Sequence, residues 1–290
     1  MPAPQIVEEG KTIREVPLGG WDSRIRVFEC DKMVRAFVVR TQRLTVVIDT
    51  LLGPQAGRWL LEAAQEQPGP LVVINSHSDW DHYWGNQAFA LPIVGSHLSL
   101  KRVLETHGPA ELAKKIKDDE RSFAGVVPTP PSVLVEGRGF LHGGDLSLHL
   151  LPTPGHRPDH LAVWIPEIRT LFPGDAVEDP FPLLDDSKSI GLADEELTSL
   201  QLLIDLKPEW VMPCHAEPQR GTALLESNRD YVDRLLEVAR RAQGNDDLLK
   251  HFPYPGPPGD DFYQSEHTRN LEQALREVVK ALPCPQGRTD

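Results

Sequence analysis

The sequence predicts an α/β fold in which mixed β-sheets are covered by helices. Short strands rich in Val, Ile and Phe follow one another closely near the start of the chain, a pattern typical of hairpins. From about residue 55 onward, amphipathic helices alternate with short apolar strands. With 290 residues and 40% hydrophobic content, the chain can bury a large core in one domain or in two fused halves.

The first half predicts a run of strands followed by helices. Strands are expected at residues 25–28, 34–39, 44–48, 71–74 and 92–94. A helix is expected over residues 55–66, because Trp59, Leu60, Ala63 and Ala64 recur on one helical face. A second helix is expected near residues 98–105. Residues 109–125 are expected to be a polar helical insertion, which the prolines at 128, 130 and 131 end.

The second half begins again with strands, expected at residues 146–151, 161–165 and 170–172. A helix over 194–206 is indicated by the apolar spacing of Leu197, Leu200, Leu203 and Ile204. A short strand at 210–212 and a long helix over 224–242 follow. The Pro- and Gly-rich residues 252–261 predict a loop, and residues 271–282 a closing helix.

Composition excludes several function classes. The formal net charge of −13 gives a surface that repels phosphate backbones, so no nucleic-acid partner is expected. The three cysteines, Cys30, Cys214 and Cys284, are too few and too scattered for a disulfide framework, which favours the reducing cytoplasm. No export signal and no apolar run of about 18 residues is visible. We therefore expect a cytoplasmic protein without a membrane partner.

Residues able to bind metal follow one apolar strand after another. Asp49 follows the strand that ends at 48, and His77, Asp79, Asp81 and His82 follow the strand that ends at 74. Three more of the predicted strands are followed by His156, Asp175 and His215. Ligands usually bind beyond the carboxyl ends of strands, on loops that rigid strands position, so we expect these side chains to meet.

The densest part of this set is His77-Ser78-Asp79-Trp80-Asp81-His82, in which four of six residues can bind a metal. On an extended loop alternate residues point the same way, so His77, Asp79 and Asp81 converge while His82 turns toward a second ion. Neutral imidazole and carboxylate ligands suit Zn²⁺, iron or Mn²⁺.

These motifs, taken together and in order, resemble the metallo-β-lactamase superfamily. The resemblance rests on VVIDT at Asp49, NSHSDWDH, TPGHRPDH at His156, LFPGDAVEDP at Asp175 and MPCHAEP at His215. It implies a four-layer αβ/βα sandwich of two mixed sheets flanked by helices, with the metals at one edge. That domain would span residues 1–220, and residues 221–290 would be a C-terminal helical extension packed on it.

The resemblance also implies a ligand set for two divalent ions, with zinc expected first and iron or manganese as alternatives. One ion would take His77, Asp79 and His156, and the other would take Asp81, His82 and His215. Asp175 would bridge the two ions, and Asp49 would support the site from behind. We expect Asp49 to be a helix-capping and supporting residue and not a ligand.

One position departs from the family pattern, because Asp79 stands where the family usually has His. Two divalent ions bring four positive charges, and the usual two carboxylates leave a net charge of two. With Asp79 as a third carboxylate the net charge falls to one, and a bridging hydroxide reduces it to zero. The sequence therefore predicts a weaker electrophile that tolerates harder ions such as iron or manganese.

The function expected from this pattern is hydrolysis of a small substrate at an ester, lactone, thioester, amide or phosphoester bond. A hydroxide bridging the two metals would be the nucleophile, with Asp81 as the catalytic residue that orients it and takes its proton. A β-lactamase is disfavoured because no export signal is visible, and a nuclease because basic surfaces and an inserted domain are missing. An iron-dependent oxidoreductase, of the sulfur dioxygenase or diiron type, is the alternative that Asp79 raises, and a non-catalytic binding module is a third.

Five further residues have open interpretations. His160 is expected either to contact substrate or to be a hydrogen-bonded structural histidine. Cys214 is expected to be a buried apolar thiol, because adjacent strand residues point in opposite directions. Trp80, Trp84 and Phe181 are expected either to line the pocket or to pack in the core.

Overall fold

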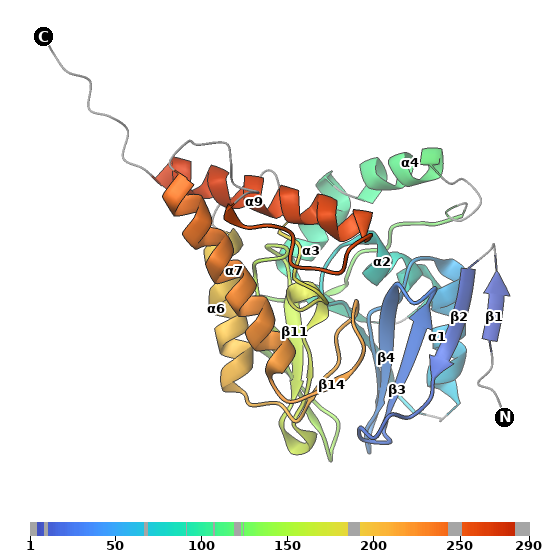
Figure 1. Cartoon of the computed structure of the whole chain (residues 1–290). Helices are drawn as coiled ribbons and strands as arrows, with labels where there is room; N and C mark the ends of the chain where they lie inside the picture. The colour runs from blue at the N-terminus through green and yellow to red at the C-terminus, as the bar shows by residue number, and fades with distance from the viewer. Residues whose placement is uncertain are drawn as a thin grey trace, which may run out of the picture.

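The computed structural model places two β-sheets face to face, with helices on their outer sides (Figure 1). It describes residues 5–8, 11–66, 69–90, 92–106, 108–118, 123, 125–184, 192–242 and 251–281. Among these residues, no helix is long and apolar enough to cross a membrane.

The first sheet contains eight strands in chain order, β1 to β8. Neighbours from β1 to β5 are antiparallel, and those from β5 to β8 are parallel. The strands are β1 Gln5–Glu8, β2 Lys11–Val16, β3 Ile25–Cys30, β4 Val34–Arg40, β5 Thr45–Ile48, β6 Leu71–Ile74, β7 Ile93–Ser96 and β8 Val133–Val135.

The second sheet contains six strands in the order β14-β13-β12-β11-β10-β9. Only β12 and β13 are parallel neighbours; the other pairs are antiparallel. The strands are β9 Gly139–His142, β10 Ser147–Pro152, β11 Leu161–Ile165, β12 Thr170–Phe172, β13 Trp210–Val211 and β14 Gln219–Arg220.

Helices form the two outer layers. In Figure 1, α1 lies beside the first sheet, α6 and α7 lie beyond the second, and α9 crosses the top of the molecule. The helices are α1 Pro54–Gln65, α2 Trp80–Tyr83, α3 His97–Lys101, α4 Gly108–Asp118, α6 Leu192–Asp205, α7 Ala223–Ala242 and α9 Asp261–Ala281. This arrangement confirms the predicted four-layer sandwich.

Two apolar cores hold these layers together. The first lies between the sheets and on the α1 face, where the rings of Phe37 on β4 and Phe172 on β12 are 4.9 Å apart. The second joins strands β10 to β13 to the C-terminal helices, and it includes Leu171, Val211, Leu235 and Leu271. Burial of apolar side chains on both faces of each sheet fixes which helix faces turn inward.

The structure confirms the predicted strands and amphipathic helices to within a few residues, with one clear error. The closing helix, predicted over 271–282, begins ten residues earlier, as α9 Asp261–Ala281. Its first turns carry polar and aromatic residues without an apolar period, so the sequence pattern missed them. The helix predicted near 98–105 divides into α3 and a π-helical turn, Arg102–Thr106. The predicted insertion contains α4, and part of residues 119–124 lies outside the described residues.

Five strands were not predicted: β1, β2, β8, β9 and β14. All are at or near the margins of the sheets, where pairing rather than an apolar pattern defines the strand. In the middle of the sheets, β5 and β6 are parallel, and β10, β12 and β13 share one direction. Their carboxyl ends therefore meet at one edge, where the predicted ligand loops begin.

Candidate metal centre

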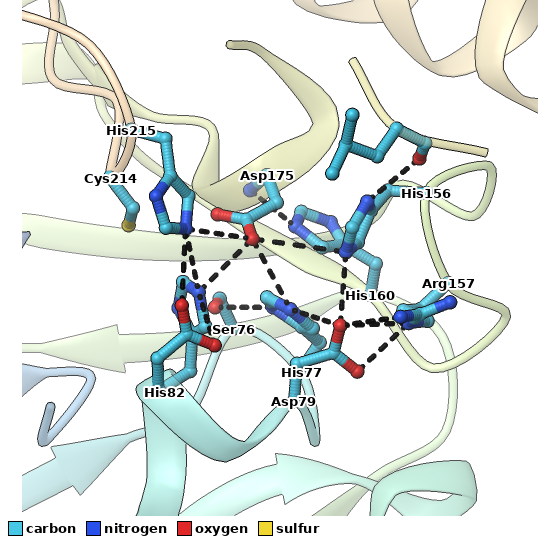
Figure 2. Close-up of polar contacts among 12 residues, drawn as sticks. Ser76, His77, Asp79, His82, His156, Arg157, His160, Asp175, Cys214 and His215 are labelled. Atoms are coloured by element: carbon cyan, nitrogen blue, oxygen red, sulfur yellow. Dashed lines mark hydrogen bonds and ion pairs between the residues drawn. The ribbon is translucent and has the colours of Figure 1, made fainter. Parts of the chain in front are cut away.

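The loops at this edge bring the seven predicted ligands together around Asp175. The carboxylate of Asp175 lies between four imidazoles (Figure 2). Its Oδ2 is 3.0 Å from Nε2 of His82 and 3.3 Å from Nε2 of His215. It is 3.6 Å from Nε2 of His77 and 3.8 Å from Nε2 of His156. One carboxylate oxygen thus faces all four imidazoles that the sequence singled out.

The remaining carboxylates divide the cluster into two halves. Oδ2 of Asp79 lies 3.3 Å from Nε2 of His156 and 3.7 Å from Nε2 of His77. The ligand atoms of these three residues all lie within 4.8 Å of one another, which is close enough to hold one ion.

The other half is built around Asp81. Its Oδ2 lies 3.5 Å from Nε2 of His215, and its Oδ1 lies 3.8 Å from Nε2 of His82. These three residues form a second group whose ligand atoms lie within 4.8 Å. The two halves and the central Asp175 correspond to the two ligand sets that the family resemblance implied.

Each of the four imidazoles makes a hydrogen bond through its outer nitrogen. Nδ1 of His156 is 2.8 Å from the carbonyl oxygen of Leu183, and Nδ1 of His215 is 2.6 Å from that of Met33. A carbonyl only accepts, so in both rings Nδ1 carries the proton and Nε2 offers its lone pair to the centre whenever the ring is neutral.

Asp49 fixes the other two imidazoles. Its Oδ2 is 2.9 Å from Nδ1 of His82 and accepts the hydroxyl proton of Ser76 at 2.7 Å. The Ser76 oxygen in turn lies 3.0 Å from Nδ1 of His77. The expectation that Asp49 supports the site is met, but Asp49 caps no helix, since the residue before α1 is Gly53.

Charges inside the cluster shift several pKa values. Burial raises the pKa of Asp175, but His215, His82 and His77 outweigh it and hold that pKa well below 3.8. Burial lowers the pKa of His215, but Asp175, Glu178 and Asp81 raise it to about 10. The pKa of His82 is raised well above 6.5 by Asp175, Asp81 and Asp49 against the opposing effect of burial. In the absence of metal, these shifts favour protonated His82 and His215 beside an ionised Asp175.

Asp79 has a partner that the sequence analysis did not identify. Nε of Arg157 donates to Oδ1 at 2.8 Å and to Oδ2 at 2.9 Å, and an η nitrogen of Arg157 lies 2.8 Å from Oδ2. Burial raises the pKa of Asp79, but Arg157, His156 and His77 lower it to well below 3.8. Asp79 therefore carries a negative charge that a guanidinium faces from the side away from His77.

A family model described as the metallo-beta-lactamase superfamily matches residues 31–215, a span that contains all seven positions. The chain belongs to the metallo-β-lactamase superfamily.

Individual relatives of this metallo-β-lactamase superfamily chain are distant. The acyl-coenzyme A thioesterase MBLAC2 of Gallus gallus is 25% identical over 231 residues, which cover 72% of this chain and 82% of that protein. The beta-lactamase-like protein 2 homolog of Caenorhabditis elegans is 26% identical over 148 residues, covering 50% of this chain and 44% of that protein. The chain thus matches less than half the length of the second relative.

A solved structure supports the fold over nearly the whole chain. A metallo-beta-lactamase family protein from Thermus thermophilus has a TM-score of 0.64 at 19% identity, covering 94% of this chain and 95% of that one. At this identity the likeness concerns the fold alone.

His160 is a structural histidine of this superfamily member. Its Nε2 accepts a hydrogen bond from the backbone N–H of Asp175 at 3.1 Å, so its Nδ1 proton is donated to Oγ1 of Thr153 at 2.8 Å. Gly174 makes this approach possible, because a Cβ there would lie 2.5 Å from Nε2 of His160. Both ring nitrogens are thus engaged, as the hydrogen-bonded interpretation expects.

Two buried glutamates also support the site, and the sequence analysis assigned neither. Oε2 of Glu196 on α6 accepts the backbone N–H of His156 at 2.8 Å. Glu196 lies three residues after Ala193 and four before Leu200, on the buried stripe of α6, so its spacing was a usable signal. Oε2 of Glu178 accepts from the hydroxyl of Tyr263 on α9 at 2.8 Å.

The remaining candidates are resolved by their surroundings. Trp84 and Phe181 are fully buried in the first and second cores, respectively. Trp80 is half-buried, and Nζ of Lys115 on α4 lies 3.6 Å from its ring centroid. Cys214 is buried as expected, yet its surroundings are not wholly apolar, since Sγ is 3.7 Å from Oδ2 of Asp49.

The donor set fits a metal centre. Among the described residues, Nε2 of His77 and Oδ1 of Asp175 are buried and make no hydrogen bond. Buried polar atoms without partners are costly, and a cation would satisfy them. Imidazole nitrogens and carboxylate oxygens together suit Zn²⁺, iron or Mn²⁺. The residues present therefore fit two divalent ions.

Proposed function

We propose that this chain is a metal-dependent hydrolase that binds two divalent ions and acts on a small substrate. His77, Asp79 and His156 hold one ion, Asp81, His82 and His215 hold the other, and Asp175 contributes to both. Zinc is the first candidate metal, because the set combines four imidazoles with carboxylates.

The observation that carries this proposal is the orientation of the four imidazoles. Their outer nitrogens are engaged by Leu183, Met33, Asp49 and Ser76, and their Nε2 atoms face the same Asp175 oxygen. A metal-binding histidine usually donates the N–H of its other ring nitrogen in this way, which fixes both tautomer and ring angle. A cluster maintained only for packing has no need of four converging lone pairs.

When bound, a pair of divalent ions supplies Lewis acidity, which lowers the pKa of water and polarises the bond to be cleaved. The chain supplies position and proton transfer. Asp81 is only 8% exposed, and its Oδ2 lies 3.5 Å from Nε2 of His215, so it is directed into the centre. We assign it the catalytic role of accepting and later returning the proton of the attacking water.

Thioesters are the first substrates to test. The matched Gallus gallus protein, covered over 82% of its length, is named an acyl-coenzyme A thioesterase. Esters, lactones, amides and phosphoesters require the same activated water, so they complete the panel.

The test combines metal analysis with hydrolysis of that panel. We expect about two ions per chain, and hydrolysis of at least one substrate that a chelator abolishes and added Zn²⁺ restores. Asp175→Ala should lower the rate by at least about 100-fold, because it removes the group shared by both ion positions. Purified protein that takes up no zinc, iron or manganese, or hydrolysis that chelators leave unchanged, would contradict the proposal.

The iron oxidoreductase remains the second candidate because Asp79 places a third carboxylate beside the ions. Carboxylate-rich sites suit harder ions. Iron as the resident metal together with oxygen consumption would favour this candidate over the hydrolase, and zinc with no redox activity would remove it.

A further inference from the structure

Asp79 and Arg157 form one closely paired unit at the rim of the metal centre. Three nitrogen–oxygen distances of 2.8, 2.9 and 2.8 Å join the guanidinium to both carboxylate oxygens. The Arg157 side chain is 15% exposed and that of Asp79 is 17% exposed, so water screens the pair only weakly. Such fork-like, charge-assisted contacts are stronger than neutral hydrogen bonds and fix the relative orientation of the two groups.

The position of the pair leaves Asp79 able to reach an ion. Arg157 follows His156 directly, so the ligand and the guanidinium are carried by one loop. Figure 2 shows Arg157 on the opposite side of the carboxylate from the centre. Oδ2 of Asp79 is still turned inward, 3.3 Å from Nε2 of His156 and 3.7 Å from Nε2 of His77.

Arg157 changes the charge of the centre. Three carboxylates, Asp79, Asp81 and Asp175, leave one positive charge on two divalent ions. A guanidinium stays protonated in proteins, so Arg157 restores a second positive charge. The charge count made from the sequence, which predicted a weaker electrophile, did not include Arg157. The fold places this cation against the third carboxylate, Asp79.

We propose that Arg157 is a positioning residue that cancels the charge of Asp79 and holds its Oδ2 toward the ion bound by His77 and His156. This inference rests on the proposed function, since it concerns ion binding at that centre. Either member alone is unfavourable: without Asp79 a partly buried guanidinium lies beside the ion position, and without Arg157 the Asp79 carboxylate loses the contacts that orient it.

The experiment is a double-variant cycle on metal binding in the full chain. Four proteins are compared: the unaltered chain, Asp79→His, Arg157→Gln and the double variant. The affinity and stoichiometry for Zn²⁺ are measured by competition with a chromophoric chelator, and the melting temperature of each metal-free protein is measured in parallel.

We expect Asp79→His to weaken the first ion position at least ten-fold and to lower the melting temperature of the metal-free chain, because Arg157 then faces an imidazole in place of the Asp79 carboxylate. Adding Arg157→Gln to the Asp79→His variant should recover most of the lost Zn²⁺ affinity and most of the lost melting temperature. Arg157→Gln in the unaltered chain should raise neither quantity. Asp79→Asn, which keeps the side-chain shape, replaces Asp79→His in the cycle if the latter does not fold.

Arg102→Gln is the matched control, since Arg102 is a partly buried arginine whose Nε lies 3.0 Å from Asp159 and 3.1 Å from the hydroxyl of Ser78 but makes no described contact with Asp79. The effect of Arg102→Gln on Zn²⁺ affinity should be the same in the unaltered chain and in the Asp79→His variant. The inference is overturned, while the proposed function stands, if Arg157→Gln changes the Zn²⁺ affinity of the unaltered chain and of the Asp79→His variant by the same factor, within three-fold. If the unaltered chain binds no ion, both are overturned.

Discussion

At the scale of single residues, the centre is organised by hydrogen bonds on the far side of each ligand. Asp49 is the hub of this support, because it contacts His82 and Ser76 and accepts the backbone N–H of residue 76 at 2.7 Å. Its backbone adopts a positive φ of 59°, which is uncommon outside glycine and is more easily tolerated by aspartate than by most residues. Backbone strain at this position is therefore associated with the orientation of two ligands.

The raised pKa values of the histidines predict a pH dependence of metal binding. His215 has a pKa of about 10 in the metal-free chain against 6.5 when unfolded, so its proton stabilises the fold below 6.5, and this contribution is lost as the pH rises through about 10. A metal needs the neutral ring, so binding must release that proton.

We therefore expect the affinity for Zn²⁺ to increase from pH 6.5 to 10, and at least one proton to be released per chain at pH 7.5. Titration calorimetry in buffers of different ionisation enthalpy measures this release directly. A binding enthalpy that does not depend on the buffer would contradict the assignment.

His160 gives a second prediction at this scale. His160→Phe leaves the backbone N–H of Asp175 and the hydroxyl of Thr153 without their partner, which should destabilise the metal-free chain by about 1–3 kcal/mol. Zinc affinity should fall as well, because the Asp175 loop is no longer held.

His142→Phe is the control for this substitution, since His142 is exposed and its Nδ1 lies 3.2 Å from the hydroxyl of Ser147. A change within about 0.5 kcal/mol is expected there. Chemical denaturation of both variants provides the comparison, and equal losses in the two would argue against a positioning role for His160.

At the scale of elements, the sequence predicted the ligands whose positions depend on where a strand ends. His77, His156, Asp175 and His215 each follow a short apolar strand, and strands β6, β10, β12 and β13 end at one edge of the sandwich. The sequence did not predict the partners of these residues. Arg157 meets Asp79 across 78 positions, and Tyr263 meets Glu178 across 85, because the packing of distant loops decides such contacts.

The contact between α7 and the loop after Asp175 predicts a further effect. Oδ1 of Asn228 accepts the backbone N–H of Glu178 at 2.9 Å, and its amide donates to the Glu178 carbonyl at 2.9 Å. Asn228→Ala leaves two buried backbone groups unpaired, so a loss of about 2–4 kcal/mol in the free energy of unfolding is expected.

Ser227→Ala, at an exposed position one residue earlier on α7, is the control and should be nearly neutral. Because Glu178 lies three residues after Asp175, Asn228→Ala should also weaken zinc binding. Loss of stability without any change in zinc affinity would show that α7 holds the fold but not the site.

At the scale of the whole molecule, the described helices α7 and α9 share an apolar core with the second sheet. The second core combines Leu171 and Val211 of the sheet with Leu235 of α7 and Leu271 of α9. The domain boundary at residue 220 stays a prediction, and the shared core fits the expectation that the extension packs on the domain before it. Helical periodicity predicted the helices of the extension, but where they pack depends on which apolar faces meet.

Truncation after Arg220 tests this continuity. Each buried Leu or Val of α7 and α9 stabilises the fold by about 1.5–3 kcal/mol, and only about 5–15 kcal/mol separates folded from unfolded chains. We expect the truncated chain to show no cooperative thermal transition. A soluble fragment melting within a few degrees of the full chain would show that residues 1–220 fold alone.

The central claim is that seven side chains from both halves of the sandwich bind one pair of ions. Anomalous diffraction from crystals of the zinc-loaded chain tests it most directly. The account predicts two peaks, one among His77, Asp79 and His156 and one among Asp81, His82 and His215, with Asp175 beside both. Zinc-loaded crystals with no peak at this edge of the sheets, or with peaks only at surface residues, would contradict it.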